Sequence, residues 1–272
     1  LSISGKDATQ HLQSSCTSNI ATLAPGMGVR TLFLSGTSKL IGAAFVINTE
    51  ESLHIVCEAG CFEAIRLDLD SLLFGKDIFF KEIECSSYWV YDETSTKADE
   101  TTFSLKAISD GFNFPLPIPN LSMCYTTTQN QKELVDYFQE NNIEENLNSS
   151  FWEAHRIQAK FPAYEKEWSE KSAALDVGFL NWIDMDKGCF PGYEVIAKSL
   201  NLGHPAKSLV LLNSTNHNTE DPLPELFIEE KKVGKITSYE ENYALAIVNW
   251  RAKDHQCFKT NHGSEYFADF PE

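Results

Sequence analysis

One short stretch of the sequence, MDKGCFPGYEVIAKSL at residues 185–200, contains residue types that could do chemistry. Its cysteine, Cys189, lies between Gly188 and Gly192. Glycines on both sides permit a tight turn in which the backbone approaches a ligand closely. From the residues alone, Cys189 is either a reactive thiol at such a turn or a small apolar residue that fills it.

Two charged residues flank this cysteine in the sequence. Lys187 comes two residues before Cys189, and Glu194 follows in the same stretch. A nearby ammonium group favours the reactive thiolate, whereas a nearby carboxylate disfavours it. Because the two residues act in opposite directions, the sequence does not decide whether the thiol is a nucleophile.

The charge of the chain narrows the classes of partner. Its 272 residues include 22 Lys and Arg against 39 Asp and Glu, which gives a formal net charge of −17. Such a surface repels phosphate backbones, so we expect no direct binding to nucleic acid. No apolar run in the sequence approaches the roughly 20 residues that a membrane-spanning helix needs, so we also expect no membrane contact.

Seven cysteines are scattered through the chain, at positions 16, 57, 61, 85, 124, 189 and 257. An odd number of cysteines in apolar stretches is typical of reduced thiols, so we expect a cytoplasmic protein. Cys57 and Cys61 are four residues apart, but no second pair or nearby histidine completes a set of metal ligands. We expect both to be buried small residues and predict no metal site.

Strands and helices alternate through the first half of the chain, which indicates an α+β fold. A short helix is expected at 7–15, and apolar residues between 62 and 73 recur at helical spacing. A run with three prolines, NFPLPIPN at 113–120, is expected to be extended and not to form a central strand. Strands are expected at 29–36, 40–49, 53–58, 77–83 and 88–93.

The second half begins with helices and ends with strands. One helix is expected at 130–141, and the next begins with a capping box from Ser150 to Glu153 and ends before Pro162. From Ser208 on, strand-like runs and turns alternate to the end of the chain. This pattern predicts a small antiparallel sheet or barrel of about 65 residues.

Residues 187–194, KGCFPGYE, resemble K-G-C-[YF]-x-G-Q-E, the signature of the YgfZ folate-binding proteins. These proteins are relatives of the glycine-cleavage T-protein, an aminomethyltransferase. The chain departs from the family pattern at Tyr193, where the family has glutamine, and at Lys160, where it has glycine. Further segments resemble the superfamily in the same order over nearly the whole chain: ISGKDATQHLQSSCTSNIATL, RIQAKFP, ALDVGFLNWIDMDKGCFPG, NLGHPAKSLVLL and KKVGKITS.

The resemblance implies a particular α+β architecture with three lobes around a central cleft. Residues 1–200 are expected to form two interleaved α/β lobes that make up the folate-binding region. Residues 201–272 are expected to form a C-terminal antiparallel β-barrel. The protein is expected to be a monomer.

The resemblance also implies a function. The chain would bind tetrahydrofolate or a related reduced folate and support the assembly or repair of iron–sulfur enzymes. Through these client enzymes it would affect tRNA modification indirectly. Cys189 is expected at the rim of the folate cleft as the catalytic thiol, in a motif with Lys187, Gly188, Gly192 and Glu194.

Four further residues are placed near the folate by the resemblance. Asp176 falls on a T-protein glutamate that hydrogen-bonds the pterin, and its carboxylate could accept two N–H groups. His204 falls near an arginine that faces the carboxylated end of the folate, and Lys207 lies three residues further on. Arg156 is expected to line the same pocket.

Two other functions stay open at this point. In the T-protein an aspartate near the folate assists amine chemistry, but the strand at 40–47 has Ala43 and Ala44 there. An aminomethyltransferase or a folate-dependent demethylase would need such a carboxylate. The other possibility is a scaffold protein that has kept the fold and lost folate binding, which the residues at Tyr193, Asp176 and His204 allow. A titration with tetrahydrofolate would distinguish such a scaffold from a folate-binding protein.

Overall fold

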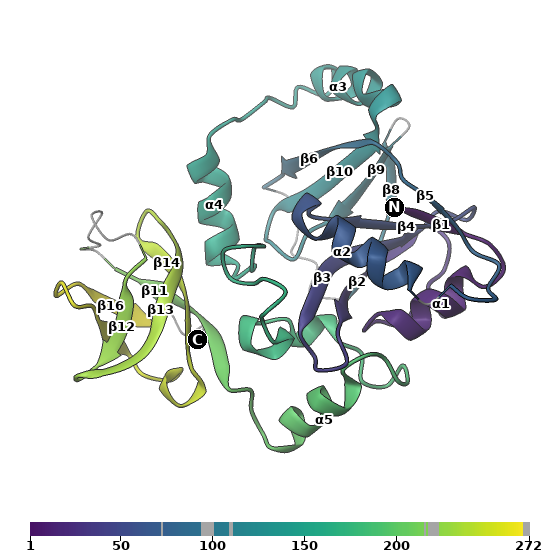
Figure 1. The fold of residues 1–272 in the computed structure, drawn as a ribbon. Coiled ribbons are helices and arrows are strands. Elements are labelled where there is room, and N and C mark those ends of the chain that lie inside the picture. The colour runs from purple at the N-terminus through teal and green to yellow at the C-terminus, as the bar shows by residue number, and fades with distance from the viewer. Residues whose placement is uncertain (72, 94–100, 109–110, 215, 217–222, 269–272) are drawn as a thin grey trace. The chain divides into compact units, whose positions relative to one another are not determined.

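The computed structural model describes residues 1–71, 73–93, 101–108, 111–214, 216 and 223–268. The chain forms two compact units, whose ribbons Figure 1 shows. The first unit consists of Leu1–Leu34, Ile41–Leu147 and Trp182–Pro191, and the second of Ser35–Leu40, Asn148–Asn181 and Gly192–Glu272. The chain therefore passes between the units several times. The expected division into two interleaved lobes at 1–200 and a barrel at 201–272 stays a prediction.

In the residues that the structure describes, the first unit contains two sheets, three α-helices and one short 3-10 helix. One sheet has six strands in the order β5-β1-β4-β3-β2-β7, and the other has four in the order β6-β10-β9-β8. The elements of this unit are β1 (Ser2–Ser4), α1 (Ala8–Ser15), β2 (Met27–Leu34), β3 (Leu40–Asn48), β4 (Leu53–Cys57), α2 (Ala59–Asp70), β5 (Phe79–Lys81), β6 (Cys85–Tyr91), β7 (Thr102–Ser104), β8 (Lys106–Ile108), β9 (Gly111–Pro115), β10 (Leu121–Thr127), η1 (Thr128–Asn130) and α3 (Gln131–Glu140).

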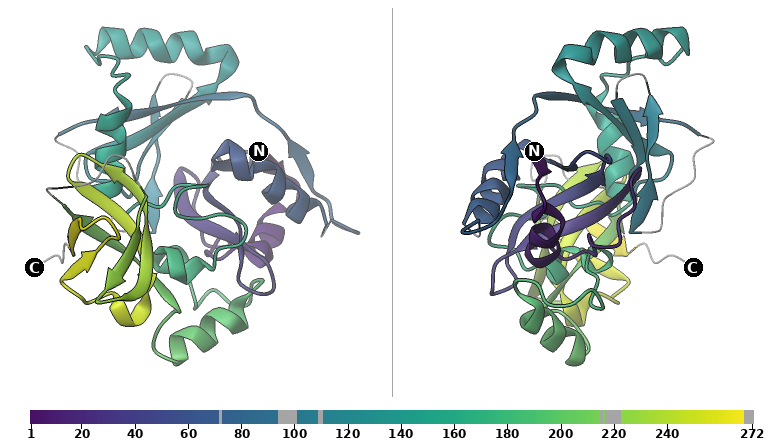
Figure 2. Two further views of the ribbon diagram at one scale, coloured as in Figure 1. Left: turned by 60° about the vertical axis from the view of Figure 1, so that its left-hand side comes forward. Right: turned by 90° about the vertical axis from the view of Figure 1, so that its right-hand side faces the viewer.

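The central strands of the six-stranded sheet are covered on both faces. Seven of the eight residues of β2 are buried, including the polar Arg30 and Thr31, so both faces of this strand are covered. Helix α2 packs directly on β3, where a Cβ at Gly42 would lie 2.4 Å from Cδ1 of Ile65. Figures 1 and 2 show α2 beside this sheet.

Aromatic rings fill much of the core of the first unit. The ring of Phe45 lies 5.0 Å from that of Phe114 and 5.6 Å from that of Trp182. Phe103 stacks on Phe114 at the same 5.0 Å. These tilted and stacked contacts are typical of buried aromatic pairs, and they join β3 and β7 of one sheet to β9 of the other.

One expectation about the prolines is wrong. Strand β9, at the start of the proline-rich run, lies between β8 and β10 inside the four-stranded sheet. Pro115 is tolerated there because it is the last residue of β9, and the pairing with β8 ends at Asn113. Its missing N–H group therefore removes no ladder hydrogen bond to β8.

The second unit contains a barrel and the helices that accompany it. Its six strands close in the order β11-β14-β13-β12-β15-β16, which confirms the expected C-terminal antiparallel barrel and the α+β class. The elements after α3 are α4 (Ser149–Gln158), η2 (Ala174–Val177), η3 (Leu180–Trp182), α5 (Tyr193–Asn201), β11 (Lys207–Asn213), β12 (Glu225–Ile228), β13 (Lys231–Glu240), β14 (Tyr243–Asn249), η4 (Trp250–Ala252), β15 (Cys257–Lys259) and β16 (Glu265–Ala268).

Large and small side chains share the barrel interior. Phe258 and Tyr266 are fully buried there, and the small side chains of Ala244 and Ala246 leave room for them. On the outside of the barrel, Ile157 of α4 packs against Leu211 and Leu245. None of the helices that the structure describes is long and apolar enough to cross a membrane.

The start of α4 differs from the sequence-based expectation. The N-cap is Asn148, whose side-chain oxygen accepts a hydrogen bond from the backbone N–H of Ser150 at 3.1 Å. The expected capping box from Ser150 to Glu153 is therefore wrong. Glu153 is instead held by hydrogen bonds from Arg156 and Lys166.

Candidate functional site

The cysteine loop, residues 187–192, is anchored by its lysine. The Nζ of Lys187 donates to the carbonyl oxygen of Cys16 at 2.6 Å and also to that of Gln13. Gln13 returns a hydrogen bond from Nε2 to the carbonyl oxygen of Lys187 at 3.2 Å. Both acceptor carbonyls lie at the C-terminal end of α1, where a helix leaves such groups unpaired and favours a cation.

This anchoring sets the environment of the lysine. Burial lowers the pKa of Lys187 below its ordinary value, although the nearby Cys16 and Asp184 oppose that shift. Two of its three N–H donors are used by the carbonyls of α1. Lys187 therefore holds the loop to α1. Its position in the sequence, two residues before Cys189, did not indicate this role.

The thiol itself lies on the outside of the loop. Cys189 is exposed, whereas the next residue, Phe190, is buried with the ammonium of Lys187 5.6 Å from its ring centre. The loop is thus fixed on both sides of the cysteine. The thiol is therefore accessible. Its reactivity and its place at the rim of a folate cleft stay predictions.

Different physical requirements place glycine at the two glycine positions of the loop, Gly188 and Gly192. Both have positive φ, +100° for Gly188 and +83° for Gly192. A Cβ at Gly188 would meet nothing within 4 Å, but a Cβ at Gly192 would lie 2.9 Å from the carbonyl oxygen of Ser35 and 2.9 Å from Cα of Ser38. Gly192 is also the N-cap of α5, so it joins the loop, the helix and the 35–38 turn.

Alanine substitutions at Gly188 and Gly192 should separate the cost of left-handed backbone from the cost of a steric clash. We expect Gly188→Ala to lower the free energy of unfolding by about 1–2 kcal/mol, the cost of a side chain in left-handed backbone. Gly192→Ala should cost clearly more, because backbone atoms that cannot move aside occupy the place of its Cβ. Urea denaturation of both variants under reducing conditions measures the difference, and equal losses would contradict the close packing at Gly192.

The remaining motif residue, Glu194, lies in the first turn of α5 and is exposed. A carboxylate there interacts favourably with the positive end of the helix dipole. Its proposed place in the motif stays a prediction.

Asp176, the predicted pterin ligand, lies in the second unit. Its Oδ1 accepts hydrogen bonds from the backbone N–H groups of Ala206 and Lys207, at 3.1 and 3.0 Å. The carboxylate therefore caps the start of β11. Oδ1 is occupied by these two donors, and we expect any ligand N–H to be accepted by Oδ2.

His204 and Lys207 lie on the same segment that Asp176 caps. The His204 ring stacks on Trp250 with ring centres 5.2 Å apart and an angle of 11° between the planes. Nδ1 of His204 lies 2.7 Å from the carbonyl oxygen of Pro205. The structure thus brings three predicted folate residues, Asp176, His204 and Lys207, to one end of β11.

Arg156 is buried, and its guanidinium group is fully engaged within the second unit. Nε and Nη2 donate to the two carboxylate oxygens of Glu153 at 3.1 and 2.8 Å, and Nη1 donates to Glu167 at 2.8 Å. The carbonyl oxygen of Phe161 and the hydroxyl of Ser238 accept the other two hydrogen bonds. All five N–H groups are thus used inside the protein, and contact with folate stays a prediction.

The carboxylates in this network were not identified from the sequence. The side chain of Glu167 is 0% exposed and also accepts hydrogen bonds from Thr237 and Ser238 of β13. Burial would raise the pKa of Glu153, but hydrogen bonds from Arg156 and Lys166 outweigh it and hold that pKa below its usual range. The network ties α4 and the 161–167 loop to β13 of the barrel.

Cys57 and Cys61 lie at the end of β4 and in the first turn of α2. Cys61 is buried and Cys57 is half-buried. A hydrogen bond with the Cys61 thiol, followed by burial, raises the pKa of Cys57. Among the described residues, no group of three or more His, Cys, Asp or Glu side chains could hold a metal ion.

Comparison with known proteins identifies the fold first. Aminomethyltransferase T of the glycine cleavage system from Bartonella henselae superposes on this chain with a TM-score of 0.80, covering 99% of this chain and 82% of that one. Sequence identity between the two is 13%. The chain therefore has the fold of a glycine-cleavage aminomethyltransferase.

Relatives that share sequence with the chain add to this likeness of fold. A chloroplastic protein of Arabidopsis thaliana, provisionally named a transferase, is 25% identical over 256 residues, which cover 87% of this chain and 59% of that protein. The tRNA-modifying protein YgfZ of Buchnera aphidicola is 34% identical over 112 residues, 40% of this chain and 34% of that protein. No family model matches. The resemblance to the T-protein and YgfZ superfamily is thereby confirmed, and the chain spans less than two thirds of each curated relative.

Proposed function

We propose that this protein binds a reduced folate, tetrahydrofolate or a close derivative, and supports iron–sulfur enzymes through Cys189. The observation that carries the proposal is the cysteine loop, which presents an exposed thiol between a lysine anchored on α1 and a buried phenylalanine. The relation to YgfZ and the aminomethyltransferase fold support the folate part of the proposal.

Aminomethyl transfer is not part of this proposal. Strand β3 has Ala43 and Ala44 where the T-protein pattern has an aspartate, and Ala44 is 1% exposed. An alanine offers neither a proton acceptor nor a charge to the amine chemistry of that reaction. Folate in this chain would therefore serve binding or regulation, and the thiol would carry the chemistry.

Any effect on tRNA would pass through a client enzyme. The net charge of −17 makes the surface of the chain unfavourable for the phosphate backbone of RNA. An exposed thiol can undergo thiol exchange or contact a cluster-bearing partner for a short time. We therefore propose iron–sulfur enzymes that modify tRNA as the clients.

A titration with tetrahydrofolate tests the proposed folate binding. The variant Asp176→Asn tests whether Asp176 contacts the ligand. Wild-type protein should bind with a change in tryptophan fluorescence. The asparagine oxygen can still accept from Ala206 and Lys207, so this variant should keep its fold while it loses the charge offered to a pterin. We expect its affinity to fall by about 1–3 kcal/mol, the cost of an unmatched buried partner.

Asp254→Asn is the matched control, because this exposed carboxylate pairs with its neighbour Lys253. The control should bind folate as the wild type does. Unchanged affinity in Asp176→Asn would remove Asp176 from the site, and failure of the wild type to bind would refute folate binding itself.

A further inference from the structure

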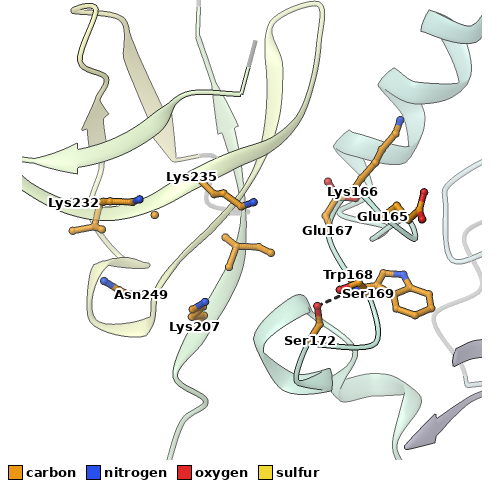
Figure 3. Close-up of a pocket in the computed structure, with 13 residues that line it drawn as sticks. Glu165, Lys166, Glu167, Trp168, Ser169, Ser172, Lys207, Lys232, Lys235 and Asn249 are labelled. Carbon is orange, nitrogen blue, oxygen red and sulfur yellow. Dashed lines mark hydrogen bonds between the residues drawn. The ribbon is translucent and has the colours of Figure 1, made fainter. Parts of the chain in front are cut away.

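Apart from the cysteine loop, the second unit carries a charged pocket and the first unit carries a pair of thiols. The pocket has a volume of about 560 Å³, and Lys207, Lys232 and Lys235 line its barrel side (Figure 3). Because it includes Lys207, this pocket belongs with the predicted folate residues described above. The thiols are those of Cys57 and Cys61, which the proposed function does not use.

Cys57 and Cys61 lie in the layer between α2 and the six-stranded sheet. Cys57 is the last residue of β4 and pairs with Ala44 of β3, so these two side chains are on the same face of the sheet. Gly42 is on that face too, two residues before Ala44, and its Cβ would lie 3.5 Å from Cβ of Cys61. Cys61 therefore reaches the sheet from α2 at the place where Cys57 reaches it from β4.

The two thiols are in hydrogen-bond contact. This hydrogen bond lowers the pKa of Cys61 and raises that of Cys57, so Cys57 is its donor. Sγ of Cys61 in turn donates to the carbonyl oxygen of Glu58 at 3.3 Å. Loss of one proton from the pair therefore leaves the negative charge on Cys61, in the first turn of α2, where the helix dipole stabilises it.

Solvent reaches the pair from the side of Cys57. Cys57 is half-buried, and residues 58–60, which follow it, are exposed. Cys61 is 0% exposed. An external reagent therefore meets Cys57 first and Cys61 second, which is the arrangement of an entry thiol and a resolving thiol.

We propose that Cys57 and Cys61 form a reversible disulfide by exchange with low-molecular-weight disulfides such as glutathione disulfide. Cys57 attacks the external disulfide and forms a mixed disulfide, and the released thiol takes up the proton of Cys57. Cys61 then attacks the sulfur of Cys57, which forms the internal S–S bond and releases the second thiol with the proton of Cys61. The protein loses two electrons and two protons, and the external disulfide gains them. Neither Cys189 nor a folate takes part, so this inference is independent of the proposed function.

Tryptic digestion after equilibration in a glutathione redox buffer and alkylation of free thiols tests the proposal. Lys39 and Arg66 bound a peptide that contains both thiols, and each of the other five cysteines lies on a tryptic peptide of its own. The internal disulfide makes peptide 40–66 lighter by two hydrogen atoms and protects it from alkylation. We expect its oxidised-to-reduced ratio to be about tenfold higher in native protein than in the urea-unfolded chain, because the fold already holds the thiols in contact. Excess dithiothreitol should restore the dithiol.

Two serine variants identify the thiols that react. Cys61→Ser should stop at the mixed disulfide of Cys57 with glutathione, because its resolving thiol is missing. Cys124→Ser is the matched control, since Cys124 is a buried cysteine of β10 in the same unit, and it should keep the internal disulfide.

The comparison of native with unfolded wild-type protein does not depend on the folding of either variant. A ratio in native protein equal to or below that in urea would overturn the proposal. Wild-type protein that stops at the glutathione adduct, or that joins either thiol to another cysteine, would overturn it as well.

Discussion

Replacing Cys189 by serine should leave the protein folded and able to bind folate, yet unable to restore iron–sulfur enzyme activity in cells that lack the wild-type protein. The side chain is exposed, so the change of one atom removes no buried contact. The loop keeps its anchors, because Lys187 and Phe190 are unchanged. What is lost is the sulfur nucleophile, since a serine hydroxyl stays un-ionised at neutral pH.

Cys85→Ser is the matched control for this prediction. Cys85 is also exposed and begins β6 in the same compact unit, but it lies outside the KGC motif. The control variant should restore client activity to the wild-type level. Both variants are compared with the wild type by three measurements: urea denaturation, tetrahydrofolate titration and the activity of an iron–sulfur enzyme in cells. Full rescue by Cys189→Ser would leave the thiol without a function and make the motif a structural turn.

Elements with strong local signals were predicted well from the sequence. The helix at 7–15 and the strands near 29–36, 40–49 and 53–58 are present as α1, β2, β3 and β4. The barrel was expected from the strand and turn pattern after Ser208, although β15 and β16 were not identified. Both are short strands of three and four residues, too short for an alternating pattern to show.

Side-chain networks could not be predicted in the same way, because their members are far apart in the sequence. Arg156 bonds to Ser238, 82 residues away, and Lys187 bonds to Cys16, 171 residues away. The cysteine motif was found from its residue types, but its lysine was expected to influence the thiol. Tertiary contacts instead place that lysine at the C-terminal end of α1, where two helix carbonyls accept its hydrogen bonds.

Replacing Arg156 by alanine should cause the largest loss of stability, about 3–5 kcal/mol in the free energy of unfolding. The substitution leaves the Glu167 carboxylate, with 0% side-chain exposure, without its cation. It also leaves the carbonyl oxygen of Phe161 and the hydroxyl of Ser238 without their donor. Hydroxyl groups of β13 still donate to Glu167, but they cannot balance its charge in a buried site.

Arg66→Ala is the control, because Arg66 also pairs with two carboxylates, Asp70 and Glu82, at 2.6 and 3.0 Å. Its side chain is 32% exposed against 3% for Arg156, so water screens its ion pairs and their loss should cost only about 0–1 kcal/mol. Urea denaturation of both variants gives the comparison. An Arg156→Ala protein as stable as Arg66→Ala, but without affinity for tetrahydrofolate, would show that the guanidinium serves a ligand and not the joint between α4 and the barrel.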